Sequence, residues 1–258
     1  MPIHRPEALT GMRGWLPVLP LVFFLCSGAA QMRAAASSSP VSSEESGVKV
    51  KHVSFPTEDG ALIAADLYGE GDRGVVLAHG GRFTKESWKP QAEQLAKAGF
   101  HVLAFDFRGF GQSHGPGDAD MFTAPMHLDV LAAVRYLRKS GAKTVAVVGG
   151  SFGGGAAADA SIAAPPGEIN ALVLLAAGGN EPAERMKAPL LVIVARDDAN
   201  DEGPRLPRIQ AWFDKAPQPK KLVVVDGSAH AQFLFQTEQS ARVMKEVLQF
   251  LSANSLRK

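Results

Sequence analysis

Short apolar runs alternate with amphipathic stretches along most of the chain, and this alternation strongly constrains its fold. Continuous apolar runs are typical of strands that are buried on both faces of a sheet. Strands that alternate with helices pair in parallel, and the helices cover both faces. The clearest runs are GVVLAHG (74–80), HVLAFDF (101–107), TVAVVG (144–149), ALVLLAA (171–177), PLLVIVA (189–195) and KLVVVDG (221–227). The sequence therefore predicts an α/β class with a doubly wound, mostly parallel sheet of about eight strands.

Two earlier runs complete the predicted sheet. VKVKHVSF (48–55) alternates with a period of two, and ALIAADLY (61–68) follows it after the turn TEDG. This pattern predicts an antiparallel hairpin at one edge of the sheet. Apolar residues at helical spacing predict amphipathic helices over residues 87–99, 126–141 and 241–253. In a sheet of this kind, reactive groups collect beyond the carboxyl ends of the strands.

A glycine-rich segment, GGSFGGG (149–155), follows the fifth predicted strand and precedes an alanine-rich run with high helix propensity. Its first five residues match G-x-S-x-G with Ser151 at the centre, and strand, tight turn and helix form the setting of a nucleophile elbow. Gly149 and Gly153 fit this reading, because a strained turn leaves no room for side chains there. The alternatives are an incidental serine and a dinucleotide fingerprint, whose spacing does not match. We predict that Ser151 is a nucleophile.

A nucleophilic serine needs a base and a carboxylate that orients the base. His230 is the only histidine after Ser151, and it follows the last predicted strand. We therefore predict that His230 is the base, with a surface-loop histidine as the alternative. The acid should lie between them, where PLLVIVARDDAND offers Asp197, Asp198 and Asp201. Asp197 and Asp198 lie in the first turn after the strand, and periodicity leaves the choice between them open.

An oxyanion site is the remaining requirement for acyl transfer. His79, Gly80 and Gly81 follow the third predicted strand, and glycine allows backbone to approach a substrate closely. We predict that the backbone N–H of Gly81 or Arg82, together with that of Phe152, stabilises the oxyanion. His79 itself is expected to be a structural turn residue.

These motifs together resemble the α/β-hydrolase superfamily, over nearly all of the chain from Val48 to Ser252. The matching segments, in the family's order, are AHGG (78–81), DFRGFGQS (106–113), GGSFGG (149–154), ARDDAND (195–201) and GSAHAQF (227–233). The family's acid usually ends a G-x-x-D pattern. Aligning Ala195 with that glycine implies Asp198 as the acid and leaves Asp197 as second choice.

Within the superfamily, HGGRF (79–83) and ESW (86–88) resemble the dienelactone-hydrolase-like esterases without a cap domain. The eponymous dienelactone hydrolases use a cysteine where this chain has serine. Only residues 179–188 separate two predicted strands at the point where many members insert a helical cap. This length is typical of an ordinary connection. We therefore expect an open site, covered mainly by local loops such as GQSHGPGDADMF (111–122).

The N-terminal segment differs in character from the rest of the chain. Basic residues precede an apolar run over residues 15–30, and small residues follow it. This layout predicts a secretory signal peptide over residues 1–36, cleaved after Ala30 or Ala36. An uncleaved membrane anchor is the alternative, but the run is short and interrupted by prolines. The only cysteine, Cys26, lies in this segment, so the mature chain would contain no thiol.

Residues 37–47 form a predicted polar linker, and residues 48–258 form the predicted hydrolase domain. The formal net charge is +1 and no long block of like charge occurs, which argues against a nucleic-acid partner. After cleavage we expect a secreted or periplasmic protein without a stable membrane anchor; with an uncleaved signal it would be membrane-anchored.

The sequence therefore predicts a serine hydrolase that cleaves small carboxylic esters through an acyl-enzyme, without a metal or organic cofactor. Ser151, Asp198 and His230 would form the catalytic triad. One alternative is a serine peptidase of the same fold, which usually carries a gating domain for which the chain has no room. The other is a binding protein on a hydrolase scaffold, which should have lost a triad member.

Overall fold

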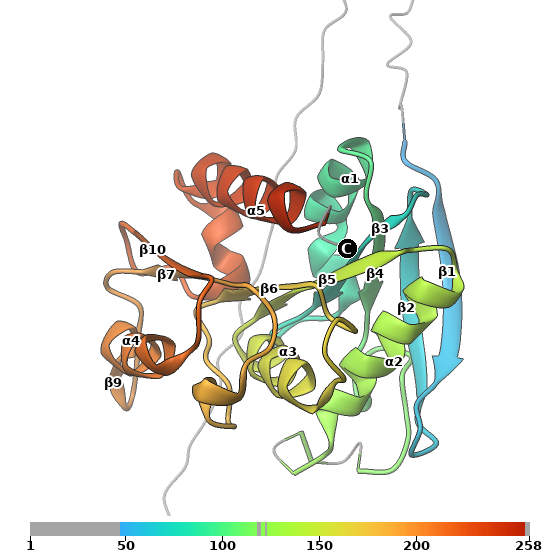
Figure 1. Cartoon of the computed structure of the whole chain (residues 1–258), viewed down its shortest axis with the longest axis horizontal. Coiled ribbons are helices and arrows are strands. Elements are labelled where there is room, and N and C mark those ends of the chain that lie inside the picture. The colour runs from blue at the N-terminus through green and yellow to red at the C-terminus, as the bar shows by residue number, and fades with distance from the viewer. Residues whose placement is uncertain (1–46, 118–119, 122, 256–258) are drawn as a thin grey trace, which may run out of the picture. The chain divides into compact units, whose positions relative to one another are not determined.

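The computed structural model describes residues 47–117, 120–121 and 123–255 (Figure 1). The elements described below belong to one compact unit, Ser46–Lys258. The predicted signal peptide and all but the last residue of the predicted linker lie outside the described residues. Within the described ranges, no helix is both long enough and apolar enough to cross a membrane.

An eight-stranded sheet runs through the centre of the molecule in the order β1-β2-β4-β3-β5-β6-β7-β10. The antiparallel pairs are β1 with β2 and β2 with β4, and the other neighbouring strands are parallel. The predicted α/β class, mostly parallel sheet and N-terminal edge hairpin are therefore confirmed. The strands are β1 (Val50–Pro56), β2 (Leu62–Tyr68), β3 (Arg73–Ala78), β4 (His101–Phe105), β5 (Thr144–Gly150), β6 (Ala171–Leu175), β7 (Leu190–Ala195) and β10 (Lys220–Val225).

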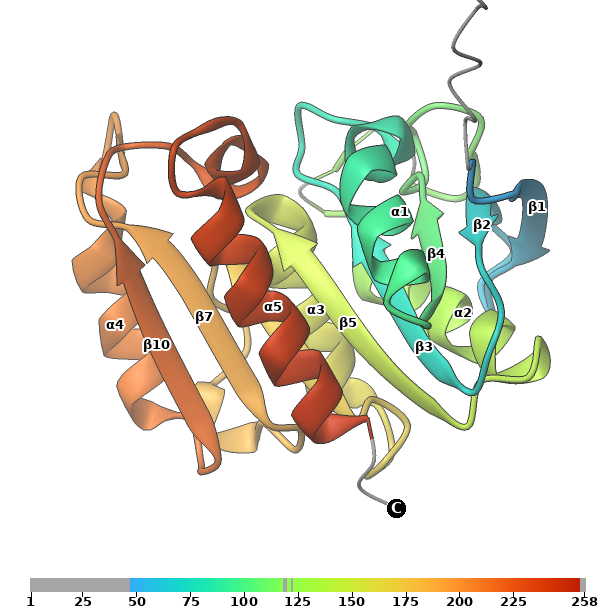
Figure 2. The ribbon, with the colours of Figure 1, turned by 90° about the horizontal axis from the view of Figure 1, so that it is seen from above.

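Helices cover both faces of the sheet, as doubly wound topology requires. Helices α1 and α5 lie on one face, and α2, α3 and α4 lie on the other (Figures 1 and 2). The first predicted helix begins as a short 3₁₀ turn, η1 (Lys85–Trp88), because Pro90 suits the first turn of the α-helix that follows. The helices are α1 (Lys89–Lys97), α2 (Met126–Lys139), α3 (Phe152–Ala163), α4 (Arg205–Lys215) and α5 (Ser240–Asn254).

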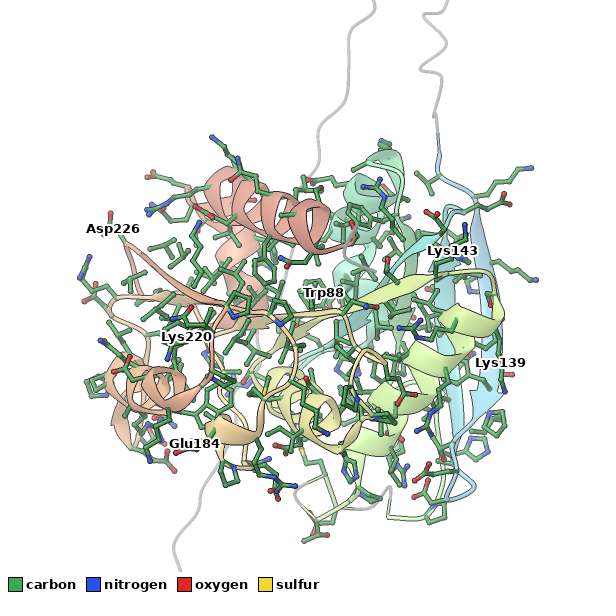
Figure 3. All side chains as sticks on the ribbon, in the orientation of Figure 1. Trp88, Lys139, Lys143, Glu184, Lys220 and Asp226 are labelled. Carbon is green, nitrogen blue, oxygen red and sulfur yellow. The ribbon has the colours of Figure 1, made fainter. Side chains whose placement is uncertain are left out.

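The core forms where the sheet meets these helices. Every residue of β4, β6 and β7 is buried, which explains why these strands read as unbroken apolar runs. Trp88 is fully buried in the interior, whereas the charged side chains of Lys139, Glu184 and Asp226 lie at the periphery (Figure 3). Burial on both faces fixes the strands, and with them the loops at their carboxyl ends.

The DFRGFGQS turn after β4 is held by a buried charge network. The Arg108 guanidinium is fully buried and donates to Asp129 on α2 (Nε–Oδ1 2.9 Å) and to Asp59 in the hairpin turn (Nη2–Oδ1 2.8 Å). The hydrogen bond from Arg108 lowers the pKa of Asp59 to about 2. Ser113 Oγ accepts from the Ala64 N–H and donates to the Asp106 carbonyl, which ties the turn to β2. These bonds give the loop a structural role: it is anchored to β2, to α2 and to the hairpin turn.

The connections that border the candidate site differ in detail from the predicted ones. Strand β3 ends at Ala78, two residues before the predicted end, because both backbone groups of Gly80 bond outside the ladder, to Gln232, His79 and Phe83. Between β6 and β7 the chain forms only a 3₁₀ turn, η2 (Ala183–Arg185), so no cap is inserted there. A small hairpin, β8 (Ala199–Asn200) and β9 (Gly203–Pro204), precedes α4.

Candidate active site

Ser151 occupies a sharp turn between β5 and α3. Its backbone has φ 50° and ψ −118°, a positive-φ conformation outside the left-handed helical region, of the sparsely populated kind that costs a non-glycine residue about 1–3 kcal/mol. Two hydrogen bonds hold the turn: Ser151 N–H donates to the Leu175 carbonyl of β6 (2.9 Å), and Gly155 N–H donates to the Ser151 carbonyl (3.0 Å). Strain that is held in place by neighbouring structure is typical of functional positions.

The flanking glycines provide the space for this turn. A Cβ atom on Gly149 would lie 2.5 Å from the Gly153 carbonyl oxygen, and one on Gly153 would lie 2.3 Å from the His79 carbonyl oxygen. Both distances are far below contact, so the elbow requires glycine at both positions. On Gly155, by contrast, the nearest atom to a Cβ would be 3.6 Å away.

Ser151, Asp198 and His230 meet at one edge of the sheet. They follow β5, β7 and β10, which are linked through parallel pairing, so their carboxyl ends lie at the same edge. His230 Nε2 is 2.7 Å from Ser151 Oγ, and His230 Nδ1 is 2.7 Å from Asp198 Oδ2. The Asp198 side chain is only 1% exposed and that of His230 is 26% exposed. A serine, an imidazole and a buried carboxylate are thus joined in one hydrogen-bonded chain.

The structure also distinguishes the candidate acids. Asp198 contacts the imidazole, whereas Asp197 and Asp201 are exposed. The second carboxylate oxygen of Asp198, Oδ1, lies 3.3 Å from Nε of Arg205, the first residue of α4. The carboxylate therefore bonds to the imidazole and forms an ion pair, without hydrogen-bond geometry, with the guanidinium, and this positive charge compensates for its removal from water.

The turn Gly80–Phe83, which carries the predicted oxyanion donors, lies beside the elbow. A Cβ atom on Gly81 would be 3.7 Å from Cβ of Phe152, so the two predicted donor segments are adjacent. His79 is buried below the turn, and its Nε2 accepts from the Phe107 N–H (3.2 Å). Nδ1 of His79 donates to the Gly80 carbonyl (2.9 Å). Burial lowers the pKa of His79, which favours the neutral ring that this pattern requires.

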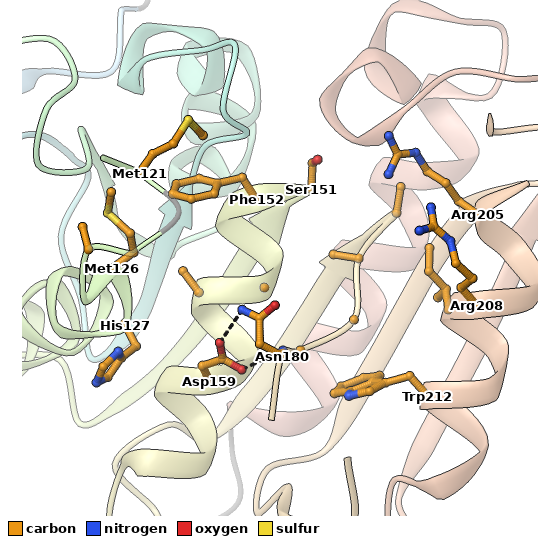
Figure 4. A pocket seen from close by; sticks show the side chains of 18 residues that line it. Met121, Met126, His127, Ser151, Phe152, Asp159, Asn180, Arg205, Arg208 and Trp212 are labelled. Atoms are coloured by element: carbon orange, nitrogen blue, oxygen red, sulfur yellow. Dashed lines mark hydrogen bonds between the residues drawn. The ribbon is translucent and has the colours of Figure 1, made fainter. Parts of the chain in front are cut away.

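A pocket of about 500 Å³ opens beside Ser151. Figure 4 shows Phe152, Met121 and Met126 on one side and Arg205, Arg208 and Trp212 of α4 on the other. At its base, the Asp159 carboxylate accepts from the Asn180 side chain (2.8 Å) and from the backbone N–H groups of Asn180 and Glu181. The volume lies within the range of small-molecule sites.

Two residues beside the triad, Gln232 and Arg205, were not among the predicted site residues. Gln232 bonds to Gly80 across a separation of 152 residues, and Arg205 meets Asp198 only because the β8–β9 hairpin turns the chain back. No local pattern encodes either contact. Among the residues that the structure describes, no group of three or more His, Cys, Asp or Glu side chains is placed to hold a metal ion.

Comparison with known proteins gives a family match and several partial relatives. The profile of the alpha/beta hydrolase fold matches residues 74–213, more than half of the chain. An epoxide hydrolase of Caballeronia sordidicola is 36% identical over 73 residues, which cover 28% of this chain and 22% of that protein. The bifunctional epoxide hydrolase 2 of Sus scrofa is 37% identical over 82 residues, covering 31% of this chain and 14% of that protein. The chain thus matches less than a quarter of the length of these curated relatives.

Solved structures of similar fold cover much more of the chain. An esterase of Pyrococcus furiosus superposes with a TM-score of 0.67 at 21% identity, covering 81% of this chain and 92% of that one. A dienelactone hydrolase of Anabaena variabilis superposes with a TM-score of 0.65 at 21% identity, covering 80% and 98%. The superpositions show that the fold is similar, whereas the profile match shows that the sequence is similar. Because the profile covers more than half of the chain, this protein belongs to the alpha/beta hydrolase fold family.

Proposed function

We propose that this hydrolase cleaves carboxylic esters through a covalent acyl-enzyme on Ser151. The observation that carries the proposal is the continuous chain from Ser151 Oγ through the His230 imidazole to the buried Asp198 carboxylate. A serine hydroxyl alone is a weak nucleophile, and a base within hydrogen-bond reach activates it. Both contacts are 2.7 Å, within the range for direct proton transfer.

In the first step Ser151 Oγ attacks the ester carbonyl carbon while His230 Nε2 takes the hydroxyl proton. The carbonyl π electrons move onto oxygen and form a tetrahedral oxyanion. Asp198 keeps the remaining imidazole proton on Nδ1, so that Nε2 is free to accept, and its negative charge stabilises the imidazolium that forms. Burial of Asp198 strengthens this interaction, because little water screens it.

The oxyanion needs donors that are already oriented when the charge develops. Phe152 begins helix α3, and the first N–H groups of a helix have no partner within the helix. The second donor in this proposal is the N–H of Gly81 or Arg82, in the turn beside Phe152. The positive end of the α3 dipole adds to the same effect.

Collapse of the tetrahedral intermediate restores the carbonyl and breaks the bond to the alcohol oxygen. The imidazolium of His230 gives its proton to that oxygen, the alcohol leaves, and the acyl group stays on Ser151. Water then attacks the acyl-enzyme with His230 again as base. The second intermediate releases the carboxylic acid and regenerates the serine hydroxyl.

The pocket beside Ser151 would receive one arm of the ester. Its volume of about 500 Å³ fits a short to medium arm, and its lining combines apolar side chains such as Met126 and Trp212 with the charged Arg205 and Arg208. The short η2 connection leaves the site without a cap, which favours small esters of varied structure. The predicted signal peptide supports a location outside the cytoplasm.

The test is hydrolysis of p-nitrophenyl butyrate by the wild type and by Ser151→Ala. Loss of several powers of ten in kcat is expected when a triad member is removed. Equal rates would refute the serine mechanism. Epoxide hydrolysis is a second candidate, because partial sequence relatives carry that name. Styrene oxide and a chromogenic peptide, assayed beside the ester, discriminate: turnover of either one without ester turnover would overturn ester hydrolysis.

A further inference from the structure

The buried side chain of Gln232 links two loops of the candidate site. Gln232 follows His230 by two residues and is 4% exposed. Its Oε1 accepts from the Gly80 N–H at 2.6 Å, and its Nε2 donates to Ser87 Oγ at 2.7 Å. Ser87 Oγ in turn donates to the Thr84 carbonyl at 2.6 Å. The histidine loop is thus bonded to both ends of segment 80–87.

Two glycines make room for this side chain. A Cβ atom on Gly80 would lie 3.2 Å from Gln232 Oε1, and one on Gly150 would lie 3.1 Å from the same atom. The G-x-S-x-G pattern does not require glycine at position 150. The space for Gln232 therefore gives a physical reason for glycine there.

The backbone turns sharply between His230 and Gln232, so that their side chains make contacts with two different loops. Ala231 has φ 50°, a left-handed conformation in a residue that carries a Cβ atom. This turn directs His230 toward Ser151 and Gln232 toward Gly80, as the hydrogen bonds of both side chains show. The hydrogen bonds of His230 to Ser151 and of Gln232 to Gly80 together compensate for the backbone strain at Ala231.

Three hydrogen bonds at Gly80 restrain the orientation of the Gly80–Phe83 turn, and Gln232 makes one of them. The Gly80 carbonyl accepts from His79 Nδ1 and from the Phe83 N–H (3.0 Å), while the Gly80 N–H is held by Gln232. Both peptide planes around Gly80 are therefore restrained. In a trans peptide the Gly81 N–H points opposite to the Gly80 carbonyl, so its direction is fixed as well.

We propose that Gln232 is a positioning residue that holds the oxyanion-binding turn in register with His230 through the Gly80 N–H; this inference rests on the ester hydrolysis proposed above. A donor that is misaligned by a fraction of an ångström still permits substrate binding but stabilises the transition state less. The effect of losing Gln232 therefore falls on kcat and not on KM.

The experiment replaces Gln232 by the similarly shaped methionine, which has no strong acceptor for the Gly80 N–H. Gln232→Met should lower kcat on p-nitrophenyl butyrate by about 10- to 100-fold, less than the loss on deleting an oxyanion donor. KM should stay within about twofold, and the inhibition constant of a trifluoromethyl ketone should rise in parallel with the loss in kcat, because its adduct carries the oxyanion. Gln236→Met, on the exposed end of the same 3₁₀ helix, is the matched control and should behave as wild type.

Gly150→Ala is a second variant, for the case that Gln232→Met does not fold. Its methyl group would press on Gln232 Oε1 and should give a smaller loss of kcat with the same unchanged KM. If the wild type turns over the ester and both variants match Gln236→Met, the role of Gln232 is refuted. A rise in KM without a loss in kcat would refute it too. A wild type without ester turnover refutes the proposed function instead.

Discussion

Replacing Asp198 by asparagine should abolish most activity through a change in the imidazole tautomer. Asp198 Oδ2 accepts from His230 Nδ1 at 2.7 Å, and Oδ1 forms an ion pair with Arg205 Nε at 3.3 Å, so an imidazole N–H and a positive charge each face one carboxylate oxygen. An asparagine amide has only one oxygen and cannot accept from both. The guanidinium is always a donor, whereas an imidazole can exchange its donor and acceptor nitrogens.

The amide oxygen of the introduced asparagine should therefore face Arg205, and its NH₂ group should face His230 Nδ1. The imidazole proton then moves to Nε2, which can no longer accept the proton of Ser151. The corresponding change in a well-studied serine protease triad lowers kcat by about 10⁴. This factor corresponds to about 5.4 kcal/mol, since each factor of ten is about 1.36 kcal/mol.

The assay is steady-state hydrolysis of p-nitrophenyl butyrate, with folding checked by circular dichroism. Asp197→Asn is the matched control, because Asp197 is exposed and should retain activity within about twofold. Arg205→Met in the Asp198→Asn background removes the competing donor, lets the amide oxygen face His230, and should recover roughly tenfold of the loss. A larger loss in Asp197→Asn than in Asp198→Asn would refute the assignment. No recovery in the double variant would refute the tautomer argument.

Three further predictions concern stability. Gly153→Ala places a methyl group 2.3 Å from the His79 carbonyl oxygen and should cost at least the 1–3 kcal/mol typical of overpacking, whereas Gly155→Ala should gain up to about 1 kcal/mol in α3. Arg108→Met leaves the buried Asp129 carboxylate unpaired and should cost about 3–5 kcal/mol. Burial lowers the folded-state pKa of His79 below its usual 6.5. The contribution of the neutral ring to the free energy of unfolding should therefore be fully present above pH 6.5 and should decrease as the pH falls below that value.

Urea titrations of the variants at pH 7.5, and of the wild type from pH 7.5 to 5.5, measure these effects. If Gly153→Ala and Gly155→Ala are equally stable, the close approach of the His79 carbonyl oxygen is not the reason for glycine at position 153. An Arg108→Met protein as stable as wild type would show that the buried charges are not coupled. Stability that stays constant or rises from pH 7.5 to 5.5 would contradict the neutral, buried state of His79.

The sequence predicted most of the fold because buried parallel strands leave a strong signal. Strand β7 is buried at every residue, so its unbroken apolar sequence identifies it as a strand without information from the rest of the chain. The same logic pointed to Ser151 and His230, since Ser151 directly follows β5 and His230 lies in the loop after β10. The choice between Asp197 and Asp198 could not be made in this way. The chain turns after Ala195, with Asp198 N–H donating to the Ala195 carbonyl, so the alternation of side chains along a strand no longer tells which residue faces inward.

Contacts between distant segments were not predictable from local patterns. The Gln232 bridge joins two segments, the histidine loop and residues 80–87, which the sheet brings together, and neither carries a local signal of the contact. The β8–β9 hairpin is likewise too short to leave a periodic signal, yet it brings Arg205 to Asp198. Glycine at position 150 was visible in the sequence, but its physical reason required the position of Gln232.

The most direct test of the account is covalent labelling with a fluorophosphonate probe, followed by peptide mass spectrometry. The probe reports an activated serine without any assumption about the natural ester. We predict one label per chain, located on Ser151, and a labelling rate that falls by orders of magnitude in His230→Ala and Asp198→Asn. Absence of labelling, or a label on another serine, would contradict the claim that Ser151, His230 and Asp198 act together as a nucleophilic triad.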